Sequence, residues 1–513
     1  MIVYTHTKKI AVPLFLFFLT FIITGYFSIL GVDPHHDGIM FKPALDVARG
    51  SMLFRDTFTQ YGALTTLLQA WALMLFGKYL LTIQLLTAFF YGLIAALLYI
   101  IYRRIMPAFL CVLTILLWIF TAPYFWLLFI PWSSVYTLFF QLLGTYLLLL
   151  YEERTNAWYL FWTGVTTVCM FFTRQPGGIF MLGAVYAYLF CILLTKNESF
   201  RKFIRALYLY TCGVVLTTSC FMIWIIANGA FRDFWLQSIQ NAYHWGADRA
   251  EATITGVITV LFPTSNTSIS LWTLLPVATM LVGIVCLIAL VRKRHVKTAK
   301  IVLIIAAVGL SAWHQYYPQN DDRHVYWGGT EMFGLLTFAL FTVSGYILSF
   351  AGRLRRNLAI VLTCVALVYF FAPYILLRFN AGIEKLRAPY VTVSQPDILR
   401  GMLLPAADAQ FYSSLAGSMT TYFQKNPRGN VVNISGDALY GAYDPRIRNI
   451  SPLYVFWLQF FVIYPDFFDT FTTYIQTNKP MVVTQESSPN GYCSLTVPPN
   501  IDNIRVYLPC QNK

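Results

Sequence analysis

The segment Tyr79–Arg104, YLLTIQLLTAFFYGLIAALLYIIYRR, decides the fold of this chain. Its first 24 residues carry no charged side chain, and Arg103 and Arg104 follow at once. About 20 apolar helical residues cross the hydrocarbon core of a bilayer. The segment is therefore expected to be a transmembrane helix that ends at a basic, water-facing surface.

Similar apolar segments recur over the first three quarters of the chain. Hydrophobic residues make up 58% of the sequence and charged residues 11%, whereas soluble domains carry about 25% charged residues. This composition excludes a soluble enzyme, a disordered chain and a small disulfide-stabilised secreted domain. It predicts an α-helical polytopic membrane protein with about eleven transmembrane helices, at residues 10–32, 79–102, 107–122, 131–151, 157–173, 177–195, 204–228, 271–291, 299–316, 329–350 and 357–378. The shorter apolar stretch 62–76 is expected to be an interfacial helix, because Gly77 and Lys78 close it too early to span.

The distribution of charge sets the expected orientation. With the amino terminus in the cytoplasm, the cytoplasmic loops hold 17 basic and 3 acidic residues, which accounts for the whole net charge of +14. This is the pattern that the positive-inside rule requires, so the basic composition needs no nucleic-acid partner. The first apolar segment is too long for a removable signal peptide and is expected to remain as a helix.

Residues 379–513 have the composition of a separate soluble domain. Polar and turn-forming residues alternate there with predicted helices at 408–424, capped by Asp408, and 466–477, and with predicted strands at 431–435, 481–485 and 504–508. We therefore expect a transmembrane domain at 1–378, including an outer loop with juxtamembrane helices at 33–78, and a small extracytoplasmic α/β domain at 379–513. Cys493 and Cys510 lie in the latter, where an oxidising compartment would allow a disulfide that their spacing alone does not establish.

The densest polar cluster follows the first apolar segment. It contains Asp33, His35, His36 and Asp37. A carboxylate at the outer mouth of a helix bundle is placed to meet a lipid-borne substrate, but Asp37 could equally be the N-cap of a helix at 38–49. The two histidines are interpreted as interfacial loop residues rather than metal ligands, because no third ligand stands at zinc-site spacing. The sequence therefore leaves open whether the protein binds a divalent metal, for which it shows no clear set of ligands, and it indicates no other cofactor.

A second feature is the sequence FTRQPGG at 172–178, which interrupts the apolar run between two predicted spans. Arginine near membrane depth costs about 2.5 to 3.5 kcal/mol on insertion scales and is a functional candidate by default. The guanidinium of Arg174 suits bidentate phosphate binding, although it could also be a turn residue that reaches the surface.

A third feature is the predicted outer loop that contains His314 and Arg323. Its side chains could bind phosphate or sugar hydroxyls. An ordinary solvated loop would look much the same, and Arg323 could simply pair with Asp321 or Asp322.

These segments together resemble the GT-C glycosyltransferases, multispanning enzymes that take a sugar from a polyprenyl phosphate. In that family an acidic residue follows the first span, and a juxtamembrane helix and an interfacial helix come before the second. Here Asp37-Gly38-Ile39-Met40-Phe41 through Ala48-Arg49-Gly50, Tyr61-Gly62-Ala63-Leu64 through Leu75-Phe76-Gly77, and Phe172-Thr173-Arg174-Gln175-Pro176-Gly177 are similar to those elements. The resemblance implies an outer-face active site.

The residues and the resemblance predict an integral glycosyltransferase of the bacterial inner membrane. It would move a sugar from a polyprenyl phosphate donor to a surface glycan or lipid-linked acceptor, by a single displacement with inversion. A phosphate leaving group needs no general acid, so one carboxylate to accept the acceptor's proton and cations to stabilise the phosphate suffice. The predicted catalytic residue is Asp37, and the predicted donor-phosphate ligands are Arg174, Arg323 and His314. Candidates for substrate contact are Asp33, His35, His36, Arg49, Arg55 and Tyr61. The alternatives are a glycan polymerase or ligase, and a lipid or oligosaccharide transporter, which would place its polar residues along the midplane of the spans.

Overall fold

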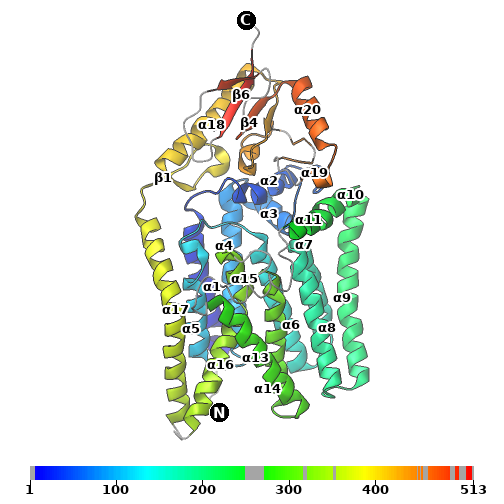
Figure 1. The fold of residues 1–513 in the computed structure, drawn as a ribbon, viewed down its shortest axis with the longest axis vertical. Coiled ribbons are helices and arrows are strands. Elements are labelled where there is room, and N and C mark those ends of the chain that lie inside the picture. The colour runs from blue at the N-terminus through cyan, green and yellow to red at the C-terminus, as the bar shows by residue number, and fades with distance from the viewer. Residues whose placement is uncertain are drawn as a thin grey trace.

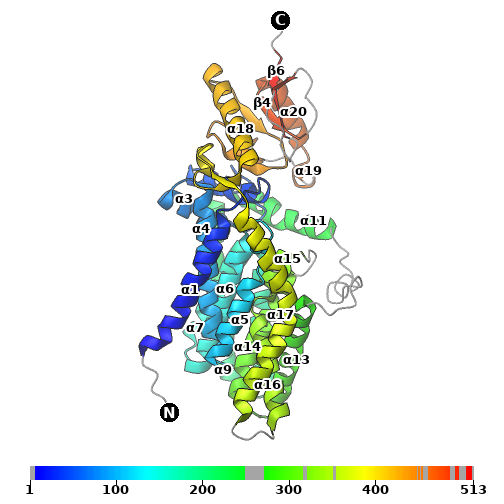
Figure 2. The same ribbon diagram turned by 90° about the vertical axis from the view of Figure 1, so that its left-hand side faces the viewer.

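The computed structural model describes residues 6–248, 271–315, 321–349, 354–447, 449–450, 452–454, 460–485, 492–495 and 504–510. Figure 1 shows a bundle of long helices with a small mixed domain at one end, and the carboxyl terminus beyond that domain. Helices α2 (His36–Ala48) and α3 (Ala63–Phe76) lie between the bundle and the domain. Figure 2 shows α1 and α17 running along the bundle, with the amino terminus at the opposite end.

All eleven predicted spans contain a helix. These helices are α1 (His6–Ser28), α4 (Leu80–Tyr102), α5 (Ala108–Phe120), α6 (Ser133–Arg154), α7 (Trp158–Thr173), α8 (Gln175–Leu194), α9 (Phe200–Ala227), α13 (Leu271–Val291), α14 (Val296–Ser311), α16 (Met332–Ile347) and α17 (Arg355–Arg387). Among the described residues, seven helices are long and apolar enough to cross a membrane, and α16 joins α15 (Asp322–Gly329) at a 60° bend as a candidate eighth span. The chain is a multi-pass membrane protein, and the count of eleven spans stays a prediction.

Short helices connect the spans at the end of the bundle that carries the domain. They are η1 (Pro123–Phe125), α10 (Phe231–Phe234), η2 (Trp235–Gln240), α11 (Asn241–Asp248) and η3 (Ala312–Gln315). The predicted helix at 62–76 is α3. The helix predicted at 38–49 is α2, which begins earlier because His35 already has helical dihedral angles, φ −75° and ψ −65°. Asp37 therefore lies inside the first turn, and its predicted role as the N-cap is wrong.

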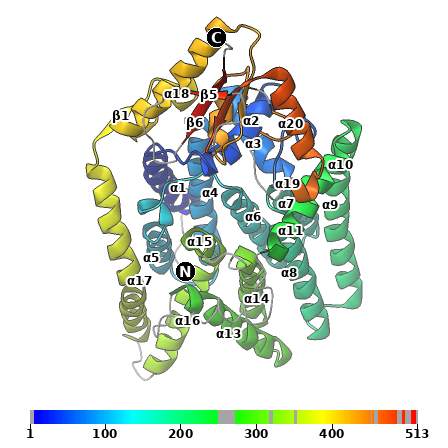
Figure 3. The same cartoon turned by 45° about the horizontal axis from the view of Figure 1, so that its top comes forward.

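The carboxyl-terminal domain is built on a four-stranded sheet in the order β3-β4-β6-β5. Strand β3 (Val431–Asn433) is parallel to β4 (Met481–Thr484), whereas β6 (Arg505–Pro509) is antiparallel to both β4 and β5 (Tyr492–Leu495). Its other elements are β1 (Tyr390–Thr392), η5 (Asp397–Leu399), β2 (Leu403–Pro405), α18 (Ala406–Lys425), η6 (Ala438–Ala442), α19 (Phe460–Ile463) and α20 (Phe467–Asn478). Figure 3 shows α18 and α20 on opposite sides of the strands. A disulfide joins Cys493 to Cys510.

The start of α18 differs from the prediction. The helix begins at Ala406 with Pro405 as its N-cap, and no side chain caps it. Asp408 lies in the first turn, so its predicted capping role is wrong. The fixed φ of a proline already favours entry into a helix at this point.

The domain packs directly on α2. The backbone N–H of Leu439 donates to the carbonyl of Pro34 at 3.2 Å, and Asn449 donates to the carboxylate of Asp46 at 3.0 Å. A Cβ atom on Gly38 would lie 2.2 Å from the backbone nitrogen of Leu439, so only glycine allows this approach. These contacts hold α2, and the segment that joins it to α1, against the carboxyl-terminal domain.

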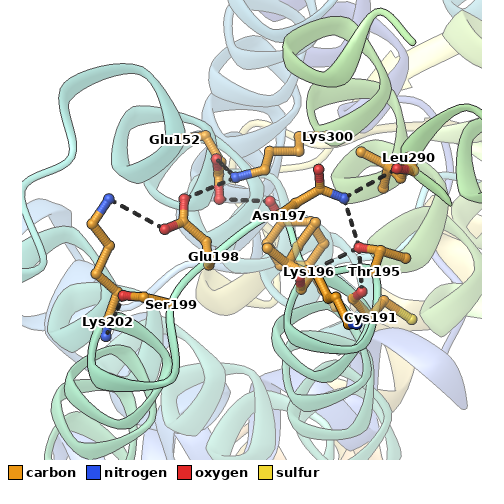
Figure 4. A network of polar contacts seen from close by, with 12 residues as sticks. Glu152, Cys191, Thr195, Lys196, Asn197, Glu198, Ser199, Lys202, Leu290 and Lys300 are labelled. Carbon is orange, nitrogen blue, oxygen red and sulfur yellow. Dashed lines mark hydrogen bonds and ion pairs between the residues drawn. The ribbon is translucent and has the colours of Figure 1, made fainter. Parts of the chain in front are cut away.

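A separate ion-pair network lies at the opposite end of the bundle (Figure 4). Lys300 on α14 lies 3.1 Å from a carboxylate oxygen of Glu152 on α6 and 3.1 Å from one of Glu198 in the loop before α9. Lys202 also pairs with Glu198, and the hydroxyl of Tyr188 donates to Glu152 at 2.6 Å. The network joins helices α6, α8, α9 and α14, and its charges compensate one another, so we interpret it as part of the fold.

Candidate functional site

The segment between α1 and α2 brings a carboxylate and an imidazole together. One carboxylate oxygen of Asp33, Oδ2, lies 2.7 Å from Nδ1 of His36, and the other, Oδ1, accepts the backbone N–H of His36 at 2.9 Å. The imidazole of His36 packs against the indole of Trp132, with ring centroids 5.3 Å apart. The His36 side chain is 35% exposed and that of Asp33 is 19% exposed, so a ligand has access to this pair.

Asp37 is fully buried directly behind this pair. Its Oδ2 accepts the backbone N–H of Asp33 at 2.9 Å, and its Oδ1 accepts the side-chain amide of Gln84 on α4 at 2.8 Å. Through these two hydrogen bonds Asp37 links the backbone of Asp33 to helix α4 of the bundle. Its predicted catalytic role stays a prediction.

The two carboxyls have opposite pKa shifts. Burial raises the pKa of Asp37 well above its ordinary value, and the charge of Asp33 adds to this. Burial also acts to raise the pKa of Asp33, but the hydrogen bond and charge of His36 outweigh it and, with Arg323, lower the pKa. Paired carboxyls whose environments separate their pKa values are typical of acid–base sites.

Arg174 lies at the junction of α7 and α8. Its backbone is extended, with φ −152° and ψ 111°, which breaks the helix and allows α8 to begin at Gln175-Pro176. The guanidinium donates from Nη1 to the hydroxyl of Ser134 at 2.5 Å and lies within electrostatic range of Tyr61 and Asp321. The break in the helix thus places the Arg174 guanidinium against the start of α6.

Arg323 reaches the same place from α15. The carboxylate of Asp321 caps this helix by accepting the backbone N–H groups of Arg323 and His324, each at 3.0 Å. The Arg323 guanidinium donates to the carbonyl of Leu128 at 3.2 Å and lies within electrostatic range of Asp33. Both Arg323 and Arg174 lie within electrostatic range of His324.

Neither arginine is neutralised by a carboxylate. Within the part of the chain that the structure describes, Arg174 and Arg323 form no ion pair, whereas Arg378, Arg400 and Arg446 each do. Both guanidiniums are partly buried. Asp321 lies within electrostatic range of Arg174, and Asp33 within that of Arg323, but neither forms a close ion pair with its arginine. A partly buried cation that is not closely paired favours an anionic ligand.

Tyr61 completes the aromatic wall of the site. Its ring meets Trp132 edge to face, with centroids 5.3 Å apart, and its hydroxyl accepts a hydrogen bond from Gln60 at 2.9 Å. Burial raises the pKa of Tyr61 to about 12, which keeps the hydroxyl protonated at neutral pH. We call the following set the α2 site: Asp33, His36, Asp37, Tyr61, Trp132, Arg174 and Arg323.

Other predicted site residues have their contacts elsewhere. His35 donates from Nδ1 to the carbonyl of Gly436 at 2.8 Å and thus contacts the carboxyl-terminal domain. Arg55 is exposed and pairs with Asp56, and Arg49 lies near Asp46 and Asp444. His314 lies in η3, but its side chain is outside the described part of the chain.

Sequence reasoning missed residues that support the site. Gln84 is the one amide side chain in the apolar run of α4, and this isolated polar group was a usable signal. Trp132 and Ser134 lie at the start of α6 and carry no such signal. Across the described ranges, no group of three or more His, Cys, Asp or Glu side chains is arranged to hold a metal ion.

The chain was compared with family models, curated proteins and solved structures. No family model matches the chain, and a search of curated proteins finds no match. Among solved structures, the apo form of the Archaeoglobus fulgidus oligosaccharyltransferase matches with a TM-score of 0.50 and 13% identity, covering 94% of this chain and 70% of that one. The chain has the fold of this oligosaccharyltransferase. The resemblance inferred from residues 33–77 and 171–178 is thereby confirmed at the level of the fold.

Two further solved structures match with lower scores. AglB from Archaeoglobus fulgidus, in complex with an inhibitory peptide and a dolichol-phosphate, matches with a TM-score of 0.48 and 12% identity over 94% of this chain and 70% of that one. The Archaeoglobus fulgidus oligosaccharyltransferase with zinc and sulfate matches with a TM-score of 0.49 and 13% identity over 93% and 67%.

Proposed function

We propose that this chain is an integral membrane glycosyltransferase that transfers a sugar from a polyprenyl phosphate donor to a glycan or lipid-linked acceptor. The observation that carries the proposal is the pair of partly buried guanidiniums, Arg174 and Arg323, without a carboxylate partner among the described residues and on the same side of the bundle as the Asp33–His36 pair. A GT-C fold in which cations and a proton acceptor meet beside α2 suits group transfer from a phosphate.

The donor phosphate is proposed to bind between Arg174 and Arg323. As the bond between the anomeric carbon and the phosphate oxygen breaks, negative charge grows on the phosphate. Fixed cations stabilise that charge without rearrangement. The phosphate needs no general acid, and direct attack by the acceptor hydroxyl inverts the anomeric centre. The rings of Tyr61 and Trp132 offer an apolar surface for the sugar.

The proposed location is the bacterial inner membrane, with the α2 site and residues 379–513 outside. The basic loops predicted to be cytoplasmic, such as the one between α13 and α14, lie at the end of the bundle opposite the carboxyl-terminal domain (Figure 1). Orientation by the positive-inside rule then puts the α2 site at the outer face. A transporter would be expected to line its spans with polar groups, whereas the α2 site lies at one end.

Mass spectrometry of surface glycans tests the proposal. Cells without the protein should lack a sugar that wild-type cells have, and Arg174→Ala and Arg323→Ala should reproduce that loss at normal protein levels. Arg400→Ala is the matched control, because Arg400 is exposed and pairs with Asp397 away from the α2 site. Identical glycans with and without the protein would contradict the proposed function.

A further inference from the structure

The two ring nitrogens of His36 differ in their contacts. Nδ1 lies 2.7 Å from the carboxylate of Asp33. Among the described residues, no group forms a hydrogen bond with Nε2 of His36. A histidine held by a carboxylate through one nitrogen presents the other to a substrate in a fixed orientation and tautomer.

Several contacts hold the pair rigidly. Asp33 is fixed at its backbone by Asp37 and through Oδ1 by the N–H of His36, at 2.9 Å in each case. The imidazole contacts the ring of Trp132 and that of His35, whose centroids are 5.3 and 5.0 Å away. A proton acceptor that needs no rearrangement before reaction is the arrangement that catalysis favours.

We propose that His36 is the group that accepts the proton of the acceptor hydroxyl, and that Asp33 positions it and stabilises the resulting imidazolium. This inference rests on the proposed function. Asp37 then acts behind the pair as a positioning residue rather than as the direct base.

The proposed step balances without a further reactant. The acceptor oxygen forms a bond to the anomeric carbon as its proton passes to Nε2 of His36. The bond between the anomeric carbon and the phosphate oxygen breaks, and its electron pair leaves with the phosphate towards Arg174 and Arg323. The imidazolium afterwards returns its proton to water.

The charges around His36 suit this role. Asp33 and the buried Asp37 come from its own segment, and Arg323 comes from α15. His35 is the adjacent titratable ring. The direct contact is with the carboxylate of Asp33, which favours the protonated imidazole once it has formed.

The test uses His36→Gln in the full-length protein, with His244→Gln as the matched control on α11. His244 contacts Tyr243 and lies outside the α2 site. His36→Gln should lower kcat by about 10² to 10⁴-fold, the usual contribution of general-base catalysis. The pH dependence of the wild-type rate should be altered in His36→Gln, because this substitution removes the proposed proton acceptor. His244→Gln should keep the wild-type rate and pH profile.

Two further readouts separate the explanations. Binding of undecaprenyl phosphate should be unchanged in His36→Gln, because the donor phosphate is held by the arginines, and the variant should elute as a monodisperse protein. Wild-type kcat and pH profile in His36→Gln, together with an inactive Asp37→Asn, would overturn the inference and return the base to Asp37. A wild-type protein that neither binds undecaprenyl phosphate nor transfers a sugar would instead contradict the proposed function itself.

Discussion

Asparagine at position 37 removes the charge of the buried carboxylate and keeps its shape. In the wild type, Asp37 accepts hydrogen bonds from the backbone of Asp33 and from the side-chain amide of Gln84. The Oε1 atom of Gln84 is buried and has no hydrogen-bond partner. If the Gln84 amide turns over, Oε1 accepts from the amide of the introduced asparagine, whose carbonyl still accepts from Asp33. Both hydrogen bonds thus survive in Asp37→Asn.

Alanine at the same position removes both acceptors. The N–H of Asp33 and the amide of Gln84 are then left buried without partners, at about 1 to 3 kcal/mol for each unsatisfied donor. We therefore expect Asp37→Ala to lower the free energy of unfolding by about 2 to 6 kcal/mol, and Asp37→Asn to lower it, at acidic pH, by less than about 1 kcal/mol.

The pH dependence gives this prediction a definite sign. The pKa of Asp37 is raised in the folded protein, so the folded state binds this proton more tightly than the unfolded chain. Wild-type stability contributed by Asp37 is therefore lost as the pH rises from the ordinary Asp value of about 4 through the raised pKa of the folded state. Asparagine has no proton to lose. The stability of Asp37→Asn relative to wild type should increase with pH.

Thermal unfolding of purified, detergent-solubilised variants between pH 4 and pH 8 measures both effects. The expected order of melting temperatures at pH 8 is Asp37→Asn at or above wild type, with Asp37→Ala well below. An asparagine variant as unstable as the alanine variant, or a difference from wild type that does not change with pH, would refute the role of Asp37 in linking Asp33 to α4. Since His36 is the proposed base, Asp37→Asn should also keep measurable transfer activity.

Other features of the structure lead to separate predictions. Gly38→Ala should increase the protease sensitivity of residues 379–513, because the added Cβ would lie 2.2 Å from the backbone of Leu439. Such overpacking costs about 1 to 3 kcal/mol. The control is Gly417→Ala on α18, where the added Cβ meets open space, and it should leave the protease sensitivity unchanged. Replacing both Cys493 and Cys510 by serine should destabilise the carboxyl-terminal domain by about 3 kcal/mol, because the disulfide joins residues 17 positions apart. The melting temperature should fall accordingly. An unchanged melting temperature under reducing and oxidising conditions would count against this prediction. Alkaline phosphatase fused after Lys513 should be active, and an inactive fusion beside a fluorescent cytoplasmic reporter would reverse the proposed orientation.

The helices could be predicted from the sequence because their signal is local. An apolar run such as that of α4 specifies a helix by composition alone, and each predicted span contains one. Helix starts were less predictable. Asp37 and Asp408 are both good N-cap residues by type, but His35 is already helical and Pro405 precedes α18, so each helix begins before its expected cap.

The α2 site was predictable in part. Asp33, His36 and Asp37 adjoin one another in the sequence, and the break at Arg174 interrupts an apolar run, so both features were visible. The hydrogen bond from Gln84 to Asp37 joins residues 47 positions apart. Arg323, which lies within electrostatic range of Asp33, is on α15, far from it in the sequence. Such contacts arise from tertiary packing, and no local pattern encodes them. For the same reason Arg49 and Arg55, close to Asp37 in sequence, have their contacts away from it.

Direct binding of a polyprenyl phosphate tests the central claim most directly. Purified protein in detergent would be titrated with undecaprenyl phosphate and, separately, with undecaprenol, which has the same chain without the phosphate. Wild type should bind the phosphate more tightly, and Arg174→Ala should lose about 10- to 100-fold of that preference, equivalent to one charge-assisted hydrogen-bonded contact of about 1.5 to 3 kcal/mol. The Arg400→Ala control should bind as wild type does. Equal affinity of the wild type for undecaprenyl phosphate and undecaprenol would contradict the account.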